Sequence, residues 1–300
     1  MIEIVNIILT NHCNSHCIYC YMDAKTNVYE EIDFYELEKF IVSFKNQGGK
    51  RILFTGGEAL LYPRIEDVLT FSKNLGLQNF LFTNGLLLNE ENIHFYKKVV
   101  DKFVISIDGP SEIHDNRRGC KGAYEHLIKV LQLFCEWKIL FDVQMTVGKQ
   151  NFSYMEDVVK NAIDFAAKKI KFAPIIKVGR GRDCADVFDD NELEKFVQKL
   201  FEIERKYEDK IAVSSNIQYL DEVKMQYTKV VPQVVWVSTN GLVQLLTSTP
   251  CEKLEIGTIK EEIDKEKVKL ALKNANDIIK ICMLKKDKFI NLFEEIENNL

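Results

Sequence analysis

Short runs of β-branched and aromatic residues alternate with longer amphipathic stretches, and this alternation limits the possible folds more than any other feature. In one of the amphipathic stretches Tyr35, Leu37, Phe40, Ile41 and Phe44 fall close to one helix face. A strand and a helix recur about every 30 residues, which predicts βαβ units and a parallel sheet. Strands are expected at 3–9, 51–54, 79–82, 103–107, 141–147 and 170–177, and helices near 34–47, 64–75, 89–99, 122–136 and 153–167.

The predicted fold class is α/β, a partial (β/α)6 barrel with a small C-terminal α+β extension. Six units occupy about 180 residues, whereas a closed eight-stranded barrel usually takes about 250. A charged helical stretch at about 190–208 marks the end of the regular strand–helix alternation. A hairpin is expected at 234–247, where Asn240-Gly241 suits a two-residue turn. The domains are therefore expected at 1–188 and 189–300.

Charge and hydropathy exclude two classes of partner. The chain has 40 basic and 45 acidic residues, a net charge of −5, and so offers no basic footprint for nucleic acid. No apolar run approaches the roughly 18–20 residues that a membrane helix needs. The N-terminal Met1-Ile2-Glu3-Ile4-Val5 has no basic leader, so we expect a cytoplasmic protein.

Three of the eight cysteines, Cys13, Cys17 and Cys20, crowd into one C-x3-C-x2-C segment. Disulfides are disfavoured in a reducing compartment. Three thiolates at this spacing can reach three corners of one iron–sulfur cubane and leave the fourth iron open for a ligand. Two alternatives remain: a buried cysteine stripe on a helix, and a zinc site with His16 as fourth ligand. Turn-favouring residues around the cysteines argue against the helix.

Further motifs follow the expected strands two, three, four and six, which places them at one edge of a parallel sheet. Two glycines before Glu58 bring backbone close to a ligand, and this carboxylate can accept from an ammonium group. Asn-Gly and Asp-Gly-Pro taken alone are turns. Arg180 either clamps a carboxylate or lies in a solvated loop. The motifs are Thr55-Gly56-Gly57-Glu58, Thr83-Asn84-Gly85, Ser106-Ile107-Asp108-Gly109-Pro110, Ile113-His114-Asp115, Arg117-Arg118-Gly119 and Gly179-Arg180-Gly181-Arg182.

In this order the motifs resemble the radical S-adenosylmethionine (SAM) superfamily over about residues 3–185, and within it the subgroup of sulfatase-maturating enzymes and peptide maturases. The resemblance implies that a [4Fe–4S] cluster and SAM are the cofactors, and that SAM chelates the open iron. Reductive cleavage of SAM then yields a 5′-deoxyadenosyl radical that abstracts hydrogen from a substrate. It also implies cluster ligation by Cys13, Cys17 and Cys20, and SAM binding by Tyr19, Gly56, Gly57, Glu58, Asn84, Ser106 and Arg118.

The C-terminal part departs from this subgroup, whose SPASM or twitch extension carries further cysteines for auxiliary clusters. Leu246 and Glu262 stand where two of those cysteines belong. We therefore expect a degenerate SPASM/twitch-like extension that has lost its metal. An alternative is that Cys184, Cys251 and Cys282 still hold a cluster. Cys251 or Cys282 is also a candidate hydrogen-atom donor to a substrate radical, and buried inert thiols are the ordinary alternative.

The resemblance makes a peptide or protein the first expected substrate, with flavodoxin or ferredoxin as electron donor. Because the barrel starts at residue 3, no N-terminal domain for capturing a leader peptide is expected. A small-molecule or cofactor biosynthetic substrate is therefore the alternative within the enzyme class. Outside it stand a zinc-stabilised binding module and a pseudo-enzyme that binds SAM without turnover.

Overall fold

A computed structural model of the 300-residue chain describes residues 2–25, 27, 29–215, 218–219, 234–245, 254–261, 266–274 and 289–290. The strands are β1 (Ile4–Ile8), β2 (Arg51–Thr55), β3 (Gln78–Thr83), β4 (Lys102–Ser106), β5 (Phe141–Val147), β6 (Lys169–Pro174), β7 (Ala212–Ser215), β8 (Gln218–Tyr219), β9 (Val234–Val237), β10 (Leu242–Leu245), β11 (Glu255–Thr258) and β12 (Phe289–Ile290).

The α-helices are α1 (Phe34–Asn46), α2 (Ile65–Asn74), α3 (Ile93–Val99), α4 (Ser111–Arg118), α5 (Ala123–Glu136), α6 (Met155–Asp164) and α7 (Asp190–Tyr207). Three short 3-10 helices are η1 (Ala59–Leu61), η2 (Phe152–Tyr154) and η3 (Gly179–Asp183), and residues 266–274 are also helical. Within the described residues, no helix is both long and apolar enough to cross a bilayer.

Two compact units make up the chain, and each carries parallel β-structure. The first unit holds residues 1–12, 25–80 and 219–300, with strand order β11-β10-β9-β1-β2-β3. Its β1 runs parallel to both β2 and β9. The second unit holds residues 13–24 and 81–218, and its strands β4-β5-β6-β7 are parallel throughout. Strand β3 is divided between the units.

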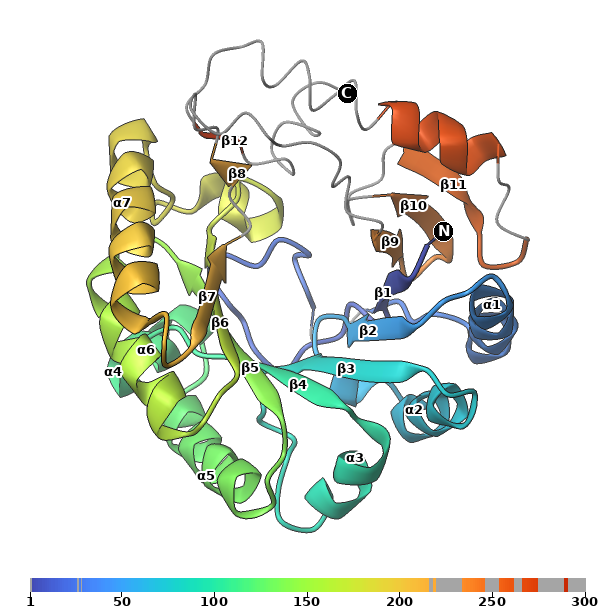
Figure 1. Cartoon of the computed structure of the whole chain (residues 1–300), viewed down its shortest axis with the longest axis horizontal. Coiled ribbons are helices and arrows are strands. Elements are labelled where there is room, and N and C mark those ends of the chain that lie inside the picture. Colours follow the sequence, from blue (N-terminus) through green and yellow to red (C-terminus); the bar gives the residue numbers. More distant parts are fainter. Residues whose placement is uncertain are drawn as a thin grey trace. The chain divides into compact units, whose positions relative to one another are not determined.

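The α/β class with a parallel sheet is confirmed, and the six expected strands and five expected helices form close to their expected bounds. Helix α4 was not predicted, because its residues were interpreted as loop motifs. In the second unit, helices α5, α6 and α7 lie along one side of strands β4–β7 (Figure 1). The boundary expected near residue 188 stays a prediction, since the units follow packing and not chain order.

Helix α1 shows how pattern and capping together fix an element. Leu37, Phe40, Ile41 and Phe44 are buried at the expected helical spacing, and the Asp33 side chain accepts the N–H of Glu36 as an N-cap. Tyr35 was expected on the same face but is 64% exposed. At 100° per residue Tyr35 lies about 170° from the middle of the stripe formed by the four buried residues, so it is on the opposite face and its placement in the stripe was wrong.

The expected hairpin is present as β9 and β10, but its turn is longer than expected. Ser238 N–H donates to Leu242 O at 3.0 Å, and Gly241 N–H donates to Ser238 O at 2.9 Å. Three residues, 239–241, therefore form the loop, and the prediction of a two-residue turn was wrong. Gly241 adopts φ of +81°, as expected for the left-handed residue that completes a three-residue hairpin loop.

Gly241 and Gly122 form a matched pair, because both have φ of +81°. A Cβ at Gly241 would lie 2.9 Å from Ile259 Cγ1, whereas one at Gly122 would meet nothing within 4 Å. Gly122→Ala should lower the free energy of unfolding by about 1–2 kcal/mol of left-handed strain. We expect Gly241→Ala to cost more, measured by urea denaturation. Equal losses would show that Ile259 moves aside without cost.

Candidate active site

The three-cysteine segment is an irregular loop in the second unit. None of residues 13–20 is helical, so the alternative of a cysteine stripe on a helix was wrong. Cys13 is buried, and Cys17 and Cys20 are half-buried. The N–H of Ser15 donates to Cys13 Sγ at 3.4 Å, and that of Ala24 to Cys20 Sγ at 3.5 Å. Backbone donors are thus already aimed at two of the three sulfurs.

The donor set of this loop fits an iron–sulfur cluster. Thiolates are the ligands that such clusters take, and hydrogen bonds to their sulfurs tune the reduction potential. Among the described residues, no group of three or more His, Cys, Asp and Glu side chains converges on a point where one metal ion would sit. A cubane takes each thiolate on a different iron, so three thiolates on one loop suit it. The zinc site with His16 as fourth ligand stays an alternative prediction.

Main-chain hydrogen bonds tie the loop to the end of helix α4. His16 N–H donates to Arg118 O at 2.9 Å, and Ile18 N–H donates to Arg117 O at 3.0 Å. Gly119 then ends the helix with φ of +58°. A Cβ at Gly119 would lie 2.9 Å from His16 O, so only glycine allows the loop to approach this closely.

Side chains from two further strand ends also hold the loop. The amide of Asn84, after β3, donates to Asn14 Oδ1 at 2.7 Å and to Ser15 Oγ at 3.2 Å. Arg180, after β6, donates from its side-chain Nε to Cys17 O at 2.8 Å, and its main-chain N–H donates to Cys20 O at 2.9 Å. Arg180 is therefore not a solvated loop residue: it binds the cysteine loop, and its Nη1 also pairs with the carboxylate of Asp23 at 2.9 Å.

In the first unit, the glycine motif after β2 packs against the residues just before Cys13. A Cβ at Gly56 would overlap Thr10 O, and one at Gly57 would overlap His12 O. Gly57 N–H donates to Thr10 O, and Glu58 N–H to His12 O, both at 2.8 Å. Close backbone approach thus accounts for both glycines. The Glu58 carboxylate is 2% exposed and caps η1 by accepting the N–H of Leu60.

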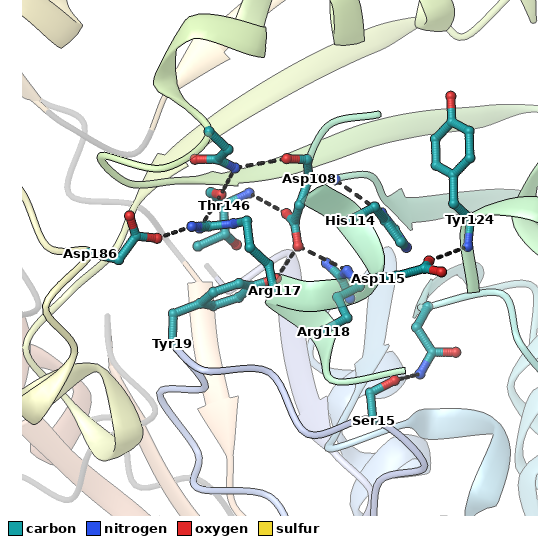
Figure 2. Close-up of polar contacts among 12 residues, drawn as sticks. Ser15, Tyr19, Asp108, His114, Asp115, Arg117, Arg118, Tyr124, Thr146 and Asp186 are labelled. Carbon is teal, nitrogen blue, oxygen red and sulfur yellow. Dashed lines mark hydrogen bonds and ion pairs between the residues drawn. The ribbon is translucent and has the colours of Figure 1, made fainter. Parts of the chain in front are cut away.

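A buried carboxylate, Asp108, organises the charges beneath the loop (Figure 2). Its Oδ2 accepts the hydroxyl of Tyr19 and lies 2.9 Å from Arg118 Nε. Its Oδ1 accepts the N–H of Thr146 at 3.1 Å. Burial opposes ionisation, but the guanidinium of Arg118 and further positive charge outweigh it and lower the pKa of Asp108. Asp108 is therefore held as a fully buried carboxylate.

Burial and this carboxylate shift the pKa of their neighbours as well. Burial, reinforced by Asp108, raises the pKa of Tyr19 well above its usual value. Burial also raises the pKa of the Cys17 thiol, although the Arg118 guanidinium opposes that shift. His114 accepts the N–H of Asp108 on Nδ1 at 3.2 Å, and burial followed by Arg118 lowers its pKa to about 4. His114 is thus a neutral acceptor.

A second buried ion pair joins Arg117 to Asp186. Both side chains are 1% exposed, and Arg117 Nη2 also donates to Thr146 O at 3.1 Å. Its guanidinium lies 5.0 Å from the Tyr19 ring centroid. The other oxygen of Asp186 accepts the N–H of Gln150 at 2.7 Å. This pair connects the end of α4 to the segment before α7.

The residues that the sequence predicted to bind SAM or to act on a substrate radical differ in what the structure shows of them. Tyr19, Asn84 and Arg118 contact protein groups that support the loop, and Ser106 is half-buried at the end of β4. Cys184 is half-buried, and burial raises its pKa. Leu246, Cys251, Glu262 and Cys282 lie outside the described residues. Their assigned roles toward cluster, cofactor and substrate radical stay predictions.

Sequence reasoning missed His114, Arg117 and Asp186. A signal existed for the first two. Arg117 and Arg118 stand three and four residues after His114, so the three lie on one helix face, and all three are buried. Charged residues on one helix face next to a strand-end aspartate indicate an internal ion-pair cluster. Asp186 carries no such local signal.

Comparison with known proteins agrees with this arrangement. A family model described as the Radical SAM superfamily matches residues 7–162. An AdoMet-dependent heme synthase of Oleidesulfovibrio alaskensis is 30% identical over 57% of this chain and 45% of its own length. The subtilosin biosynthesis protein AlbA of Bacillus subtilis is 28% identical over 58% of this chain and 40% of its own. The chain thus spans less than half the length of these two relatives.

The fold is similar to that of solved structures at low sequence identity. One is anSMEcpe with bound AdoMet and Kp18Cys peptide, at a TM-score of 0.71 and 19% identity. The alignment covers 91% of this chain and 82% of that one.

Removing the Arg118 charge should destabilise the fold strongly. Arg118→Met leaves Asp108 buried without its closest cation, and breaking a buried pair typically costs about 3–5 kcal/mol. Combining Arg118→Met with Asp108→Asn should recover part of the loss, because no uncompensated charge is then buried. Urea denaturation of the single and double variants measures this. A Tyr19→Phe variant, which keeps both charges, is the milder control.

Neutral His114 makes stability fall as the solution is acidified below about pH 6.5. The unfolded histidine binds a proton near pH 6.5, whereas the folded pKa is about 4, so the unfolded state takes up more protons in between. This one group contributes a slope of up to about 1.4 kcal/mol per pH unit. His114→Gln should flatten the stability curve between pH 4.5 and 6.5. An unchanged curve in His114→Gln would contradict the assignment.

Proposed function

This chain belongs to the radical SAM superfamily, and on that premise we propose that it cleaves SAM reductively at a [4Fe–4S] cluster and abstracts hydrogen from a carbon of a peptide or protein. A [4Fe–4S] cluster and SAM are the cofactors of this family of enzymes. When bound, they supply one-electron cleavage of the sulfonium and a carbon radical that removes hydrogen. The observation that carries the proposal is the three-cysteine loop, anchored by the ends of β3, α4 and β6.

Cys13, Cys17 and Cys20 are the proposed cluster ligands. The bonds from Ser15 and Ala24 to two of the sulfurs would place positive dipoles beside the thiolates and raise the reduction potential. The carbonyls of Arg117 and Arg118 accept main-chain N–H groups of the loop and so hold its main chain against helix α4. A prepositioned loop needs little rearrangement when an electron arrives.

Glu58, Gly56, Gly57, Asn84, Ser106, Tyr19 and Arg118 are the residues proposed to bind or position SAM. Glu58 suits the role of acceptor for an ammonium group, because its buried carboxylate gains most from a charge-assisted bond. Tyr19 and Arg118 are proposed as positioning residues, since Asp108 engages both side chains. Asn84 is proposed to act through the loop that it holds.

A peptide or protein substrate is supported by the relatives. AlbA is named for the biosynthesis of the bacteriocin subtilosin, and anSMEcpe was crystallised with a peptide. The heme synthase relative supports the second candidate, a small-molecule or cofactor biosynthetic substrate. An electron donor such as flavodoxin or ferredoxin, and a hydrogen-atom donor role for Cys251 or Cys282, belong to the same proposal.

The proposal predicts a defined product. Anaerobically reconstituted protein with a strong reductant should convert SAM to 5′-deoxyadenosine and methionine, and should hold about four irons per chain. Replacing Cys13, Cys17 and Cys20 together by alanine should remove the iron, the cluster absorbance and the product. Cys135, an exposed thiol on α5, gives the matched control, because Cys135→Ala should change none of these.

Formation of S-adenosylhomocysteine without 5′-deoxyadenosine would contradict the radical mechanism. About eight irons per chain, or cluster absorbance that survives loss of the loop cysteines, would instead show a second cluster. Iron and sulfide analysis under anaerobic conditions separates these results.

A further inference from the structure

Strands β5 and β6 have two different faces. Along both strands, every second residue is buried and the residues between them are half-buried. Val143, Met145, Ile170 and Phe172 belong to the buried set, and helix α6 packs against both strands. Side chains of alternate residues point to opposite faces of a sheet, so the half-buried residues share the other face.

On that other face, four polar residues stand in one row across four neighbouring strands. The strand register places Ser106 of β4 beside Gln144 of β5, Gln144 beside Lys171 of β6, and Lys171 beside Ser214 of β7. Parallel strands lie about 4.8 Å apart, so neighbouring side chains of the row are within reach of one small ligand. The row meets the carboxyl edge of the sheet, where α/β folds bind ligands, at Ser106, the last residue of β4, and crosses the middle of β5 and β6 at Gln144 and Lys171.

Lys171 is the charge in this row, and it has no counter-ion among the described residues. The charge that acts on it, Lys169, is also positive, while Asp142, two residues before Gln144 on β5, is paired with Lys102 at 2.8 Å. Burial, followed by this repulsion, lowers the pKa of Lys171. Part of its surface is nevertheless open to solvent, so a ligand can approach it. Buried charges are ordinarily paired.

Ser214 gives a second, independent indication of a missing partner. Its Oγ is buried and has no hydrogen-bond partner in the part of the chain that the structure describes. Buried polar atoms in native proteins nearly always have one. The unsatisfied hydroxyl and the unpaired ammonium are neighbours in the row.

We propose that Lys171, with Gln144 and Ser214, binds a carboxylate of the substrate. The inference rests on the proposed function and names the chemical group by which the enzyme recognises its substrate. A carboxylate supplies the negative charge that Lys171 lacks and the acceptor that the Ser214 hydroxyl lacks. The amide of Gln144 can donate to the same oxygens.

The row suits a carboxylate better than a phosphate group. It holds one cation and two neutral donors, and a monoanion matches one ammonium. A phosphate dianion would leave charge uncompensated in a partly buried setting. The carboxylate could belong to the substrate or to SAM itself, since Ser106, at the end of the row, is among the proposed SAM residues. The experiment separates these two sources.

The test uses glutarate as the probe, with its uncharged analogue glutaramide as control, titrated calorimetrically into cluster-reconstituted, SAM-loaded protein at constant ionic strength. Wild-type protein should bind glutarate saturably and should not bind glutaramide. Lys171→Met should weaken glutarate binding about tenfold or more, the loss expected for one charge-assisted hydrogen bond. Lys168→Met, an exposed lysine just before β6, should stay within about twofold of wild type.

Several outcomes would overturn the proposal. Equal glutarate affinity of Lys171→Met and wild type, or tighter binding of inorganic phosphate than of glutarate, would exclude this carboxylate site. A tenfold loss of SAM affinity in Lys171→Met would assign the row to the cofactor. Lys171→Gln provides a second neutral variant, and the melting temperature of both shows that they fold. If wild type forms no 5′-deoxyadenosine yet binds glutarate through Lys171, the proposed function fails and the site stands.

Discussion

The buried ion pair between Asp108 and Arg118 is the interaction on which the arrangement around the cysteine loop depends. Burying a carboxylate costs several kcal/mol unless a cation and hydrogen bonds compensate it. Here the compensation comes from Arg118, the Tyr19 hydroxyl and the Thr146 N–H. Arg118 neutralises the charge from helix α4, but Tyr19 belongs to the cysteine loop, so the carboxylate has this set of hydrogen bonds only when the loop lies against the helix.

The end of helix α4 serves two purposes with the same two residues. The side chains of Arg117 and Arg118 neutralise Asp186 and Asp108, while their carbonyls accept the N–H groups of Ile18 and His16. A helix end leaves its last carbonyls without intrahelical partners, so it is a natural acceptor for an irregular loop. Gly119 completes the arrangement by leaving room for His16 O. Loop position and helix position are thereby specified together.

Much of the fold was predictable because burial patterns are local. Buried and half-buried residues alternate along strands such as β5, and helix α1 buries residues at a period of 3.6. Both patterns can be recognised in a short stretch of sequence. Helix α4 was missed because its inward face carries His114, Arg117 and Arg118 in place of apolar residues. In the candidate site, the three cysteines and the strand-end motifs could be recognised from the sequence. The ion-pair partners could not: nothing near Asp186 in the sequence indicates that a residue 69 positions away neutralises it.

The strand-end motifs also show how a motif can be located correctly while its contacts differ from those expected. Gly56 and Gly57 were expected to approach a ligand, which stays a prediction, and they also let the backbone before Cys13 pack closely beside them. Asn84 and Arg180 likewise contact the loop. A loop that must present three thiolates in fixed positions has few regular hydrogen bonds of its own, so other elements must supply them. Glycine, asparagine and arginine at strand ends supply such contacts. The contacts of these motifs therefore indicate that they support the loop, and through the loop they affect the chemistry.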